Sequence, residues 1–200
     1  MKKITLLSTL VLFTAMHTFA QNDPAQALPY AQIPEYPESY SAATVAARMV
    51  DALGFRYYWA TDSLREEDLA YRPSPDARTT GETVDHILGL TRMILNAAAK
   101  RENVRPDPSP ALTFAETRRA TLESLEEASE LLKSGNDAAM EDMQIVSRRG
   151  DTRTAFPFWN ILNGPLADAM YHTGQIVSFR RASGNPMNPK VNVFLGNVRE

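Results

Sequence analysis

The residues best suited to chemistry in this sequence are two histidines and one aspartate. Beyond residue 20 the chain contains only two histidines, His86 and His172, so any imidazole chemistry there uses one or both of them. Asp168 precedes His172 by four residues, a spacing at which two helical side chains can converge on one ion. Two imidazoles and one carboxylate form a facial ligand set that leaves positions open for water or substrate. These residues therefore predict a divalent metal site.

Helical phase predicts that these side chains face inward. His86 shares an apolar stripe with Leu90 and Met93, which predicts that it points into a bundle and away from water. A second inward seam comprises Ile161, Pro165, Asp168, His172, Ile176 and Phe179. A buried carboxylate is costly unless it is paired or binds a metal. The sequence is also compatible with a metal-free bundle, in which Asp168 pairs with His172 and His86 bonds to a backbone carbonyl.

Four helices are predicted to position these residues, so the expected fold is an all-α four-helix bundle. They run from Ser41 to a point before Pro73, from Thr79 to about Lys100, from Thr113 to Gly135 and from about Pro157 to Arg181. Thr79 with Glu82, and Thr113 with Glu116, have the spacing of capping boxes, which start helices. Gly164-Pro165 predicts a kink or a delayed start in the last helix.

The remaining segments are predicted to be short or irregular. Residues 21–40 are rich in proline and predict an extended arm on the surface of the bundle, which itself spans residues 41–184. The stretch from Met143 to Thr154 predicts a short hairpin or a loop, with Arg149-Gly150-Asp151 as a polar turn. Residues 185–200 form a tail, whose apolar part from Val191 to Leu195 is expected to dock against the bundle.

Residues 1–20 have the layout of a signal peptide. Lys2 and Lys3 precede an apolar run from Ile4 to Met16, and small residues end at Ala20. The run is shorter than the roughly 20 residues that a membrane-spanning helix needs. We therefore expect an exported protein, periplasmic or extracellular, with no membrane attachment after cleavage. The absence of cysteine excludes a lipid-anchored lipoprotein.

The net charge and the length of the chain indicate which classes of partner to expect. The net charge is -3, and no run rich in lysine or arginine is present, so a nucleic-acid partner is not expected. A chain of this length can bury one core without disulfides. We expect a small-molecule substrate or ligand, and a homodimer stays open.

Two segments resemble the DinB-like family of four-helix proteins that hold a metal ion between their helices. The string EDLAYRPSP at residues 67–75, followed by RTTGETVDHI at residues 78–87, resembles the junction of the family's first two helices. The string DAMYHTGQI at residues 168–176 resembles its final helix, which usually reads His-x-x-x-His before a Gly-Gln-Ile/Leu step. The resemblance covers about residues 41–184.

The resemblance implies roles for four residues. His86 and His172 match two metal ligands of the family, while Asp168 stands where a histidine is usual. A carboxylate makes the site harder and more anionic, so zinc, nickel, iron(II) and manganese all stay open. Gln175 is placed to orient one of these metal-binding side chains through a hydrogen bond, without itself touching the ion.

Several functions follow from the resemblance. Relatives include thiol-dependent S-transferases, maleylpyruvate isomerase acting with a low-molecular-weight thiol, and metal-dependent hydrolases, in which a metal activates a thiol or water by lowering its pKa. Export removes the protein from the cytosolic thiol pool, which favours a hydrolase of a small molecule over a transferase. The alternative is a non-catalytic bundle that binds a metal or ligand. No catalytic residue is assigned, because Glu82 is expected to serve its capping box and Tyr171 helix packing.

Overall fold

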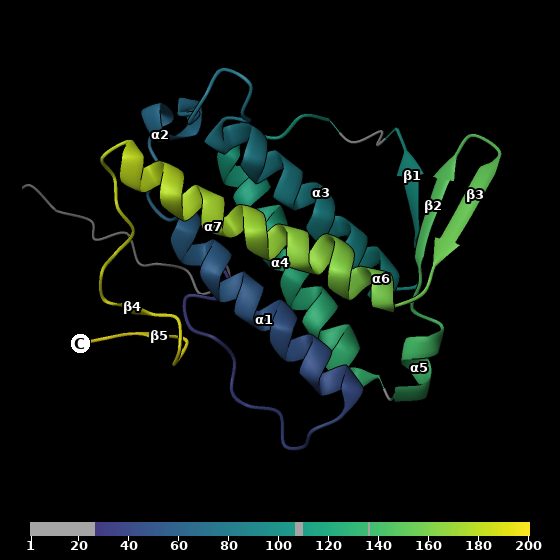
Figure 1. Ribbon diagram of the computed structural model, residues 1–200. Helices are drawn as coiled ribbons and strands as arrows, with labels where there is room; N and C mark the ends of the chain where they lie inside the picture. The colour runs from purple at the N-terminus through teal and green to yellow at the C-terminus, as the bar shows by residue number, and fades with distance from the viewer. Residues whose placement is uncertain (1–26, 107–109, 136) are drawn as a thin grey trace, which may run out of the picture.

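The structure, a computed structural model, is mostly helical and also contains two small β-sheets (Figure 1). It describes residues 27–106, 110–135 and 137–200, so the predicted signal peptide lies outside the described residues. The helical elements are α1 (Ala42–Thr61), α2 (Glu66–Ala70), α3 (Thr80–Ala98), α4 (Phe114–Ser134), α5 (Asp137–Glu141), α6 (Trp159–Ile161), the π-helical turn η2 (Leu162–Leu166) and α7 (Ala167–Ala182). The strands are β1 (Glu102–Arg105), β2 (Ile145–Arg149), β3 (Thr152–Phe156), β4 (Val191–Asn192) and β5 (Asn197–Val198).

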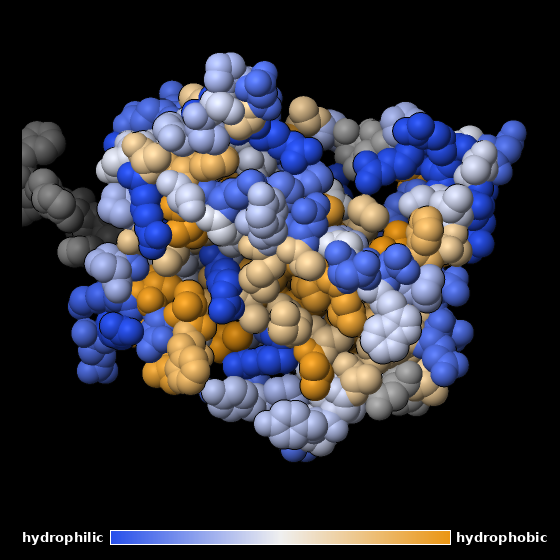
Figure 2. Space-filling view, in the orientation of Figure 1, coloured by the Kyte–Doolittle hydropathy of each residue, from blue (hydrophilic) through white to orange (hydrophobic). Residues whose placement is uncertain are grey.

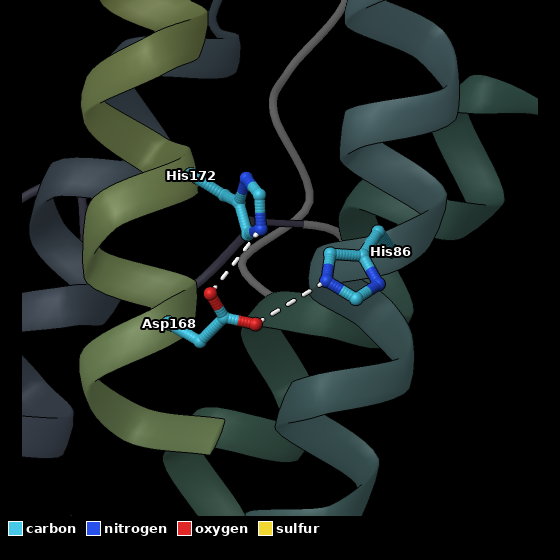
Figure 3. Close-up of side chains that lie close together, drawn as sticks. All are labelled: His86, Asp168 and His172. Carbon is cyan, nitrogen blue, oxygen red and sulfur yellow. Dashed lines mark hydrogen bonds and ion pairs between the residues drawn. The ribbon is translucent and has the colours of Figure 1, made fainter. Parts of the chain in front are cut away.

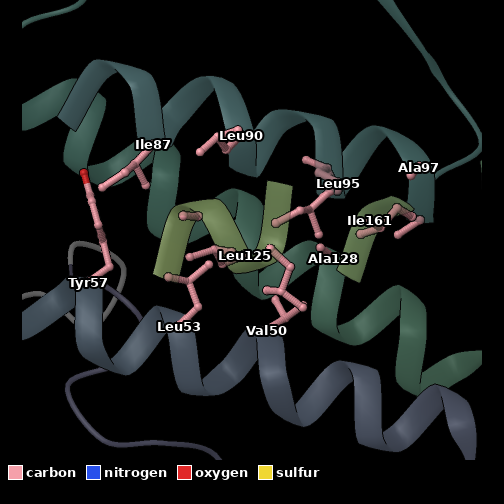
Figure 4. Close-up of a cluster of buried hydrophobic side chains, with 14 of the residues drawn as sticks. Val50, Leu53, Tyr57, Ile87, Leu90, Leu95, Ala97, Leu125, Ala128 and Ile161 are labelled. Carbon is pink, nitrogen blue, oxygen red and sulfur yellow. The ribbon is translucent and has the colours of Figure 1, made fainter. Parts of the chain in front are cut away.

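The long helices α1, α3, α4 and α7 pack around one apolar core. Val50, Leu53, Ile87 and Leu125 are buried in it at the meeting of α1, α3 and α4 (Figure 4), and Ile176 joins them from α7. Both predicted capping boxes start their helices as expected. Thr79 accepts from the Glu82 amide at 3.0 Å, and Thr113 accepts from the Glu116 amide at 3.3 Å. These bonds satisfy amides that the first turn leaves without partners.

The first predicted helix is wrong in length. It ends at Thr61, and the separate short helix α2 follows after Ser63, whose backbone has φ of +54°. A left-handed residue cannot continue a right-handed helix, so the chain turns here although the apolar pattern runs on. The turn allows α2 to lie against the start of α3 and the end of α7 (Figure 1), where Asp68 accepts hydrogen bonds from Ser183 at 2.6 Å and Asn185 at 2.7 Å.

The predicted hairpin is confirmed, and a third strand joins it. Strands β2 and β3 are antiparallel and are linked by Gly150 and Asp151, with φ of +55° at Gly150, so the Arg-Gly-Asp tripeptide is a turn. Strand β1 pairs in parallel with β2, which the sequence analysis missed. A parallel pair has a long connection and therefore no local turn signal.

The last helix is divided as Gly164-Pro165 predicted. Gly164 departs from helical geometry with φ of −98° and ψ of −109°, and the π-helical turn η2 separates α6 from α7. Pro165 has no N–H to donate to the preceding turn, which favours such a break. The helix α7 begins directly after this break, with Asp168 in its first turn.

The arm and the tail are more closely connected than predicted. Tyr30 of the arm is only 5% exposed, and its hydroxyl donates to buried Asp51 at 3.0 Å. The tail bonds to the arm, since the Ile33 amide donates to the Gly196 carbonyl at 2.9 Å. Val193, Phe194 and Leu195 are exposed, so this apolar part of the tail is not buried against the bundle as predicted. Among the described residues, none of the helices has the length and apolar character needed to cross a bilayer.

Candidate metal centre

Helices α3 and α7 bring the three predicted side chains together (Figure 3). The Asp168 carboxylate lies between the two imidazoles. Its Oδ2 is 3.3 Å from His86 Nε2, and its Oδ1 is 3.3 Å from His172 Nε2. The two rings are themselves close, with centroids 4.7 Å apart in an edge-on arrangement. The common inward phase read from the sequence thus predicted which side chains meet.

The donor set fits a divalent metal. One ligand atom from each residue can be chosen so that all three lie within 4.8 Å of one another. Two ligand atoms bonded to one ion at about 2.1 Å with tetrahedral angles would be about 3.4 Å apart. The two observed nitrogen–oxygen distances of 3.3 Å, one to each oxygen of Asp168, are close to this separation.

Two of the three side chains lie nearer to solvent than the sequence predicted, whereas His172 is buried as predicted. The His172 side chain is 11% exposed, but those of His86 and Asp168 are 31% and 44% exposed. The expectation of a buried carboxylate is therefore wrong. Pro165 and His172, the neighbours of Asp168 in the predicted seam, are both buried, so this face of the helix keeps its inward phase and Asp168 lies at its solvent-facing edge. Partial exposure leaves the group accessible to an ion and a small molecule.

The side chain of Gln175 favours one tautomer of His172. The His172 Nδ1 atom lies 2.6 Å from Gln175 Oε1, and an amide oxygen can only accept, so Nδ1 carries the hydrogen. In the neutral ring, Nε2 then presents a lone pair to Asp168 Oδ1. Two acceptors that face each other need a proton or a cation between them. Gln175 therefore contacts a predicted ligand, as its place three residues after His172 predicted.

Electrostatics favour the neutral form of His86. Burial lowers the pKa of His86, and the positive charge of Arg78 lowers it further, while the hydrogen bond to Asp168 acts in the opposite direction. Neutral imidazole is the form that binds metals. Glu82 lies in the first turn of the same helix, α3. It accepts a hydrogen bond from the Thr79 amide at 2.7 Å and therefore serves the capping box, as predicted.

A groove of about 500 Å³ adjoins Asp168. It was not among the features predicted from the sequence. Its lining comprises Leu90, Asn163, Gly164, Pro165, Ala167, Asp168 and Tyr171. Tyr171 was expected to serve helix packing, yet its residue is 62% exposed. The Gly164-Pro165 pair is the only local signal, because a break in a helix opens space beside the turn that follows.

A larger apolar hollow of about 620 Å³ shares no residue with this groove. Val45 and Met49 of α1, Met140 of α5, and Phe158 and Trp159 line it. Figure 2 shows apolar side chains gathered on this face, over the space between α1 and α6. The hollow contains no predicted site residue.

Comparison with known proteins identifies the family. The model of the DinB superfamily matches residues 54–176, which include His86, Asp168 and His172. The chain therefore belongs to the DinB superfamily. No curated protein and no solved structure matches the chain. The family fits metal binding, and these three residues form a group that could hold an ion.

Proposed function

We propose that this chain is an exported DinB-type four-helix bundle that binds a divalent metal through His86, Asp168 and His172 and hydrolyses a small molecule. The bundle would consist of α1, α3, α4 and α7, which share one core. The observation that carries the proposal is the orientation of His172, whose Nε2 faces a carboxylate while Nδ1 is held by Gln175. A cation between Nε2 and Asp168 satisfies both groups.

Each residue has a distinct part in the proposed site. His86 from α3 and the pair from α7 would hold the ion, and Asp168 supplies the one negative charge among the three. Gln175 keeps the ring of His172 in one orientation and one tautomer. A bound divalent metal supplies Lewis acidity and lowers the pKa of a water or thiol. The groove beside Asp168 provides room for a small molecule.

Hydrolysis is favoured over thiol transfer by the expected compartment. The layout of residues 1–20 supports export, and an exported protein does not meet the reduced cytosolic thiols. The ligand set is compatible with zinc, nickel, iron(II) and manganese, because Asp168 is a harder ligand than the imidazole usual at this position.

Two alternatives make different predictions. A non-catalytic bundle would bind the metal or a ligand with no turnover. A metal-free bundle would need a second proton on His172 to pair with Asp168. In that alternative His86 was expected to bond a backbone carbonyl, whereas its Nε2 lies beside Asp168.

The decisive experiment measures metal content and thermal stability together. Elemental analysis of protein purified without added metal should find one equivalent. A ligand that binds only the folded state stabilises it by about 2.7 kcal/mol at 100 times its dissociation constant. A domain of this size shifts by about 2 to 4 °C per kcal/mol, so a chelator should lower the melting temperature by roughly 5 to 10 °C.

The variant His172→Ala serves as the control for that measurement. It should abolish the difference between metal-loaded and chelated samples, even if it lowers both melting temperatures. If zinc, nickel, manganese and iron(II) all leave the parent's melting curve unmoved, the metal-free pairing becomes the correct account. Metal without turnover of ester, amide or lactone substrates would favour the binding bundle.

A further inference from the structure

The hydroxyl of Tyr171 is the end of a chain of polar contacts that starts at the proposed metal ligand. His172 Nδ1 donates to Gln175 Oε1 at 2.6 Å, and Gln175 Nε2 donates to the Tyr171 hydroxyl oxygen at 3.2 Å. The rings of Tyr171 and His172 also touch edge-on, with centroids 5.2 Å apart. The tyrosine is thus positioned by the same groups that orient His172.

The hydrogen of this hydroxyl has no acceptor among the described residues. The Tyr171 oxygen accepts from Gln175, and no hydrogen bond donated by Tyr171 is formed within those parts of the chain. A phenolic hydroxyl both donates and accepts, so one half of its capacity is unused. An exposed tyrosine usually satisfies that half with water, and because Tyr171 lines a groove, a bound molecule could replace this water.

The groove joins the tyrosine to the metal ligands. Asp168 and Tyr171 are one helical turn apart on α7, and both line the same hollow of about 500 Å³. Leu90, Pro165 and Ala167 give this hollow an apolar side, and Asn163 adds one polar side chain. A molecule in the groove would therefore have a polar end near Asp168 and an apolar part against Leu90 and Pro165.

We propose that the groove is the substrate-binding site and that the Tyr171 hydroxyl donates a hydrogen bond to an oxygen of the bound molecule. The site would take small carbonyl or carboxylate compounds with an apolar substituent. Carboxylate and carbonyl oxygens accept hydrogen bonds and also coordinate divalent metals, so one group can meet both the ion and the tyrosine. This inference rests on the proposed metal site.

Benzoate is a suitable probe, because it combines a carboxylate with an apolar ring. The protein lacking residues 1–20 is loaded with cobalt(II), whose visible absorption reports its ligands, and is titrated with benzoate. The parent should show a saturable spectral change. Tyr171→Phe removes only the hydroxyl and should weaken benzoate binding about tenfold, while cobalt affinity stays within about twofold.

The variant Tyr40→Phe is the matched control, because Tyr40 is 98% exposed and lies outside the groove. It should leave both affinities unchanged. Equal benzoate affinity in the parent and Tyr171→Phe overturns the inference while the metal site stands. A loss of cobalt affinity in Tyr171→Phe also overturns it, because the tyrosine would then act only by holding Gln175. If cobalt does not bind the parent, the metal site and this inference both fail.

Discussion

Gln175 accepts a hydrogen bond of 2.6 Å from His172 Nδ1, one helical turn away on the same helix. This contact decides which ring nitrogen of His172 faces Asp168. It also ties the proposed metal ligand to a side chain that would not itself touch the ion. Hydrogen bonds of this kind fix the tautomer and the ring orientation of metal-binding histidines.

Removing the acceptor should weaken metal binding. We expect Gln175→Leu to lower metal affinity about 10- to 100-fold, because the ring of His172 is no longer held with Nε2 toward Asp168. Gln175→Glu keeps an oxygen at this position and should retain affinity. Competition with a chromogenic chelator measures both. The control is Ser178→Ala, an exposed position on the same helix, and an unchanged affinity in Gln175→Leu would contradict the proposed role.

Asp168 offers a test of ligand identity. Asp168→His restores the residue that is usual at this position in the resembling family and should retain metal, while Asp168→Ala should weaken binding much more. Both changes remove the carboxylate, so the comparison separates loss of charge from loss of a ligand. Isothermal titration with zinc and manganese should also show that Asp168→His favours zinc, the metal that prefers nitrogen. Equal binding by the parent and both variants would show that Asp168 is not a ligand.

Asp68 should make stability depend on acid pH. This fully buried carboxylate is bonded by the Arg65 guanidinium at 2.8 and 2.9 Å, which holds its pKa far below the usual value, and Ser183 and Asn185 add to the effect. The unfolded chain takes up the proton first, at a pKa of about 3.9. The ionised Asp68 carboxylate therefore contributes its full stabilisation to the folded state above that pH, and this stabilisation decreases as the pH falls below it.

The variant Asp68→Asn tests this sign. At pH 7 we expect its free energy of unfolding to be lower than the parent's by about 2 kcal/mol, since hydrogen bonds to a charged acceptor are lost. This difference in the free energy of unfolding should become smaller as the pH falls from about 5 to 2. Urea denaturation at three pH values measures it, with Glu66→Gln as an exposed control on the same helix. A gap that does not change with pH would show that the charge of Asp68 is not what stabilises this contact.

Two helical glycines should respond oppositely to the same substitution. A Cβ added at Gly54 would lie 2.5 Å from the Tyr30 ring, whereas nothing lies within 4 Å of one added at Gly89. Gly54→Ala should therefore displace the arm and lower the free energy of unfolding by about 1 to 3 kcal/mol. Gly89→Ala should raise it by about 0.5 to 1 kcal/mol, because alanine loses less backbone entropy in a helix.

A double-mutant cycle checks the cause. In a Tyr30→Ala background the cost of Gly54→Ala should largely disappear, because the ring that the methyl group meets is gone. Thermal or urea unfolding gives the four stabilities. A cost that persists in that background would place the clash elsewhere.

Local patterns in the sequence determined where α3 and α4 begin and which faces of α3 and α7 carry the site residues. The capping boxes at Thr79 and Thr113 start helices because hydroxyl and carboxylate lie three residues apart, a relation that depends on the chain alone. The common phase of His86 and His172 likewise depends on helical periodicity, which is fixed by the backbone. These features could be predicted because each involves neighbours within one or two turns.

The tertiary structure decided how the elements meet and how open the site is. Strand β1 pairs with β2 across a long connection, and no local signal marks such a pairing. Asp168 lies at the solvent-facing edge of the site, and Gly164 and Pro165 of the π-helical turn line the groove beside it together with Tyr171. Periodicity gives the face of a helix on which a side chain lies, but it does not give how far neighbouring helices cover that face. The packing of α7 against α3 sets that coverage, and it depends on contacts between residues about eighty positions apart, as His86 and Asp168 are.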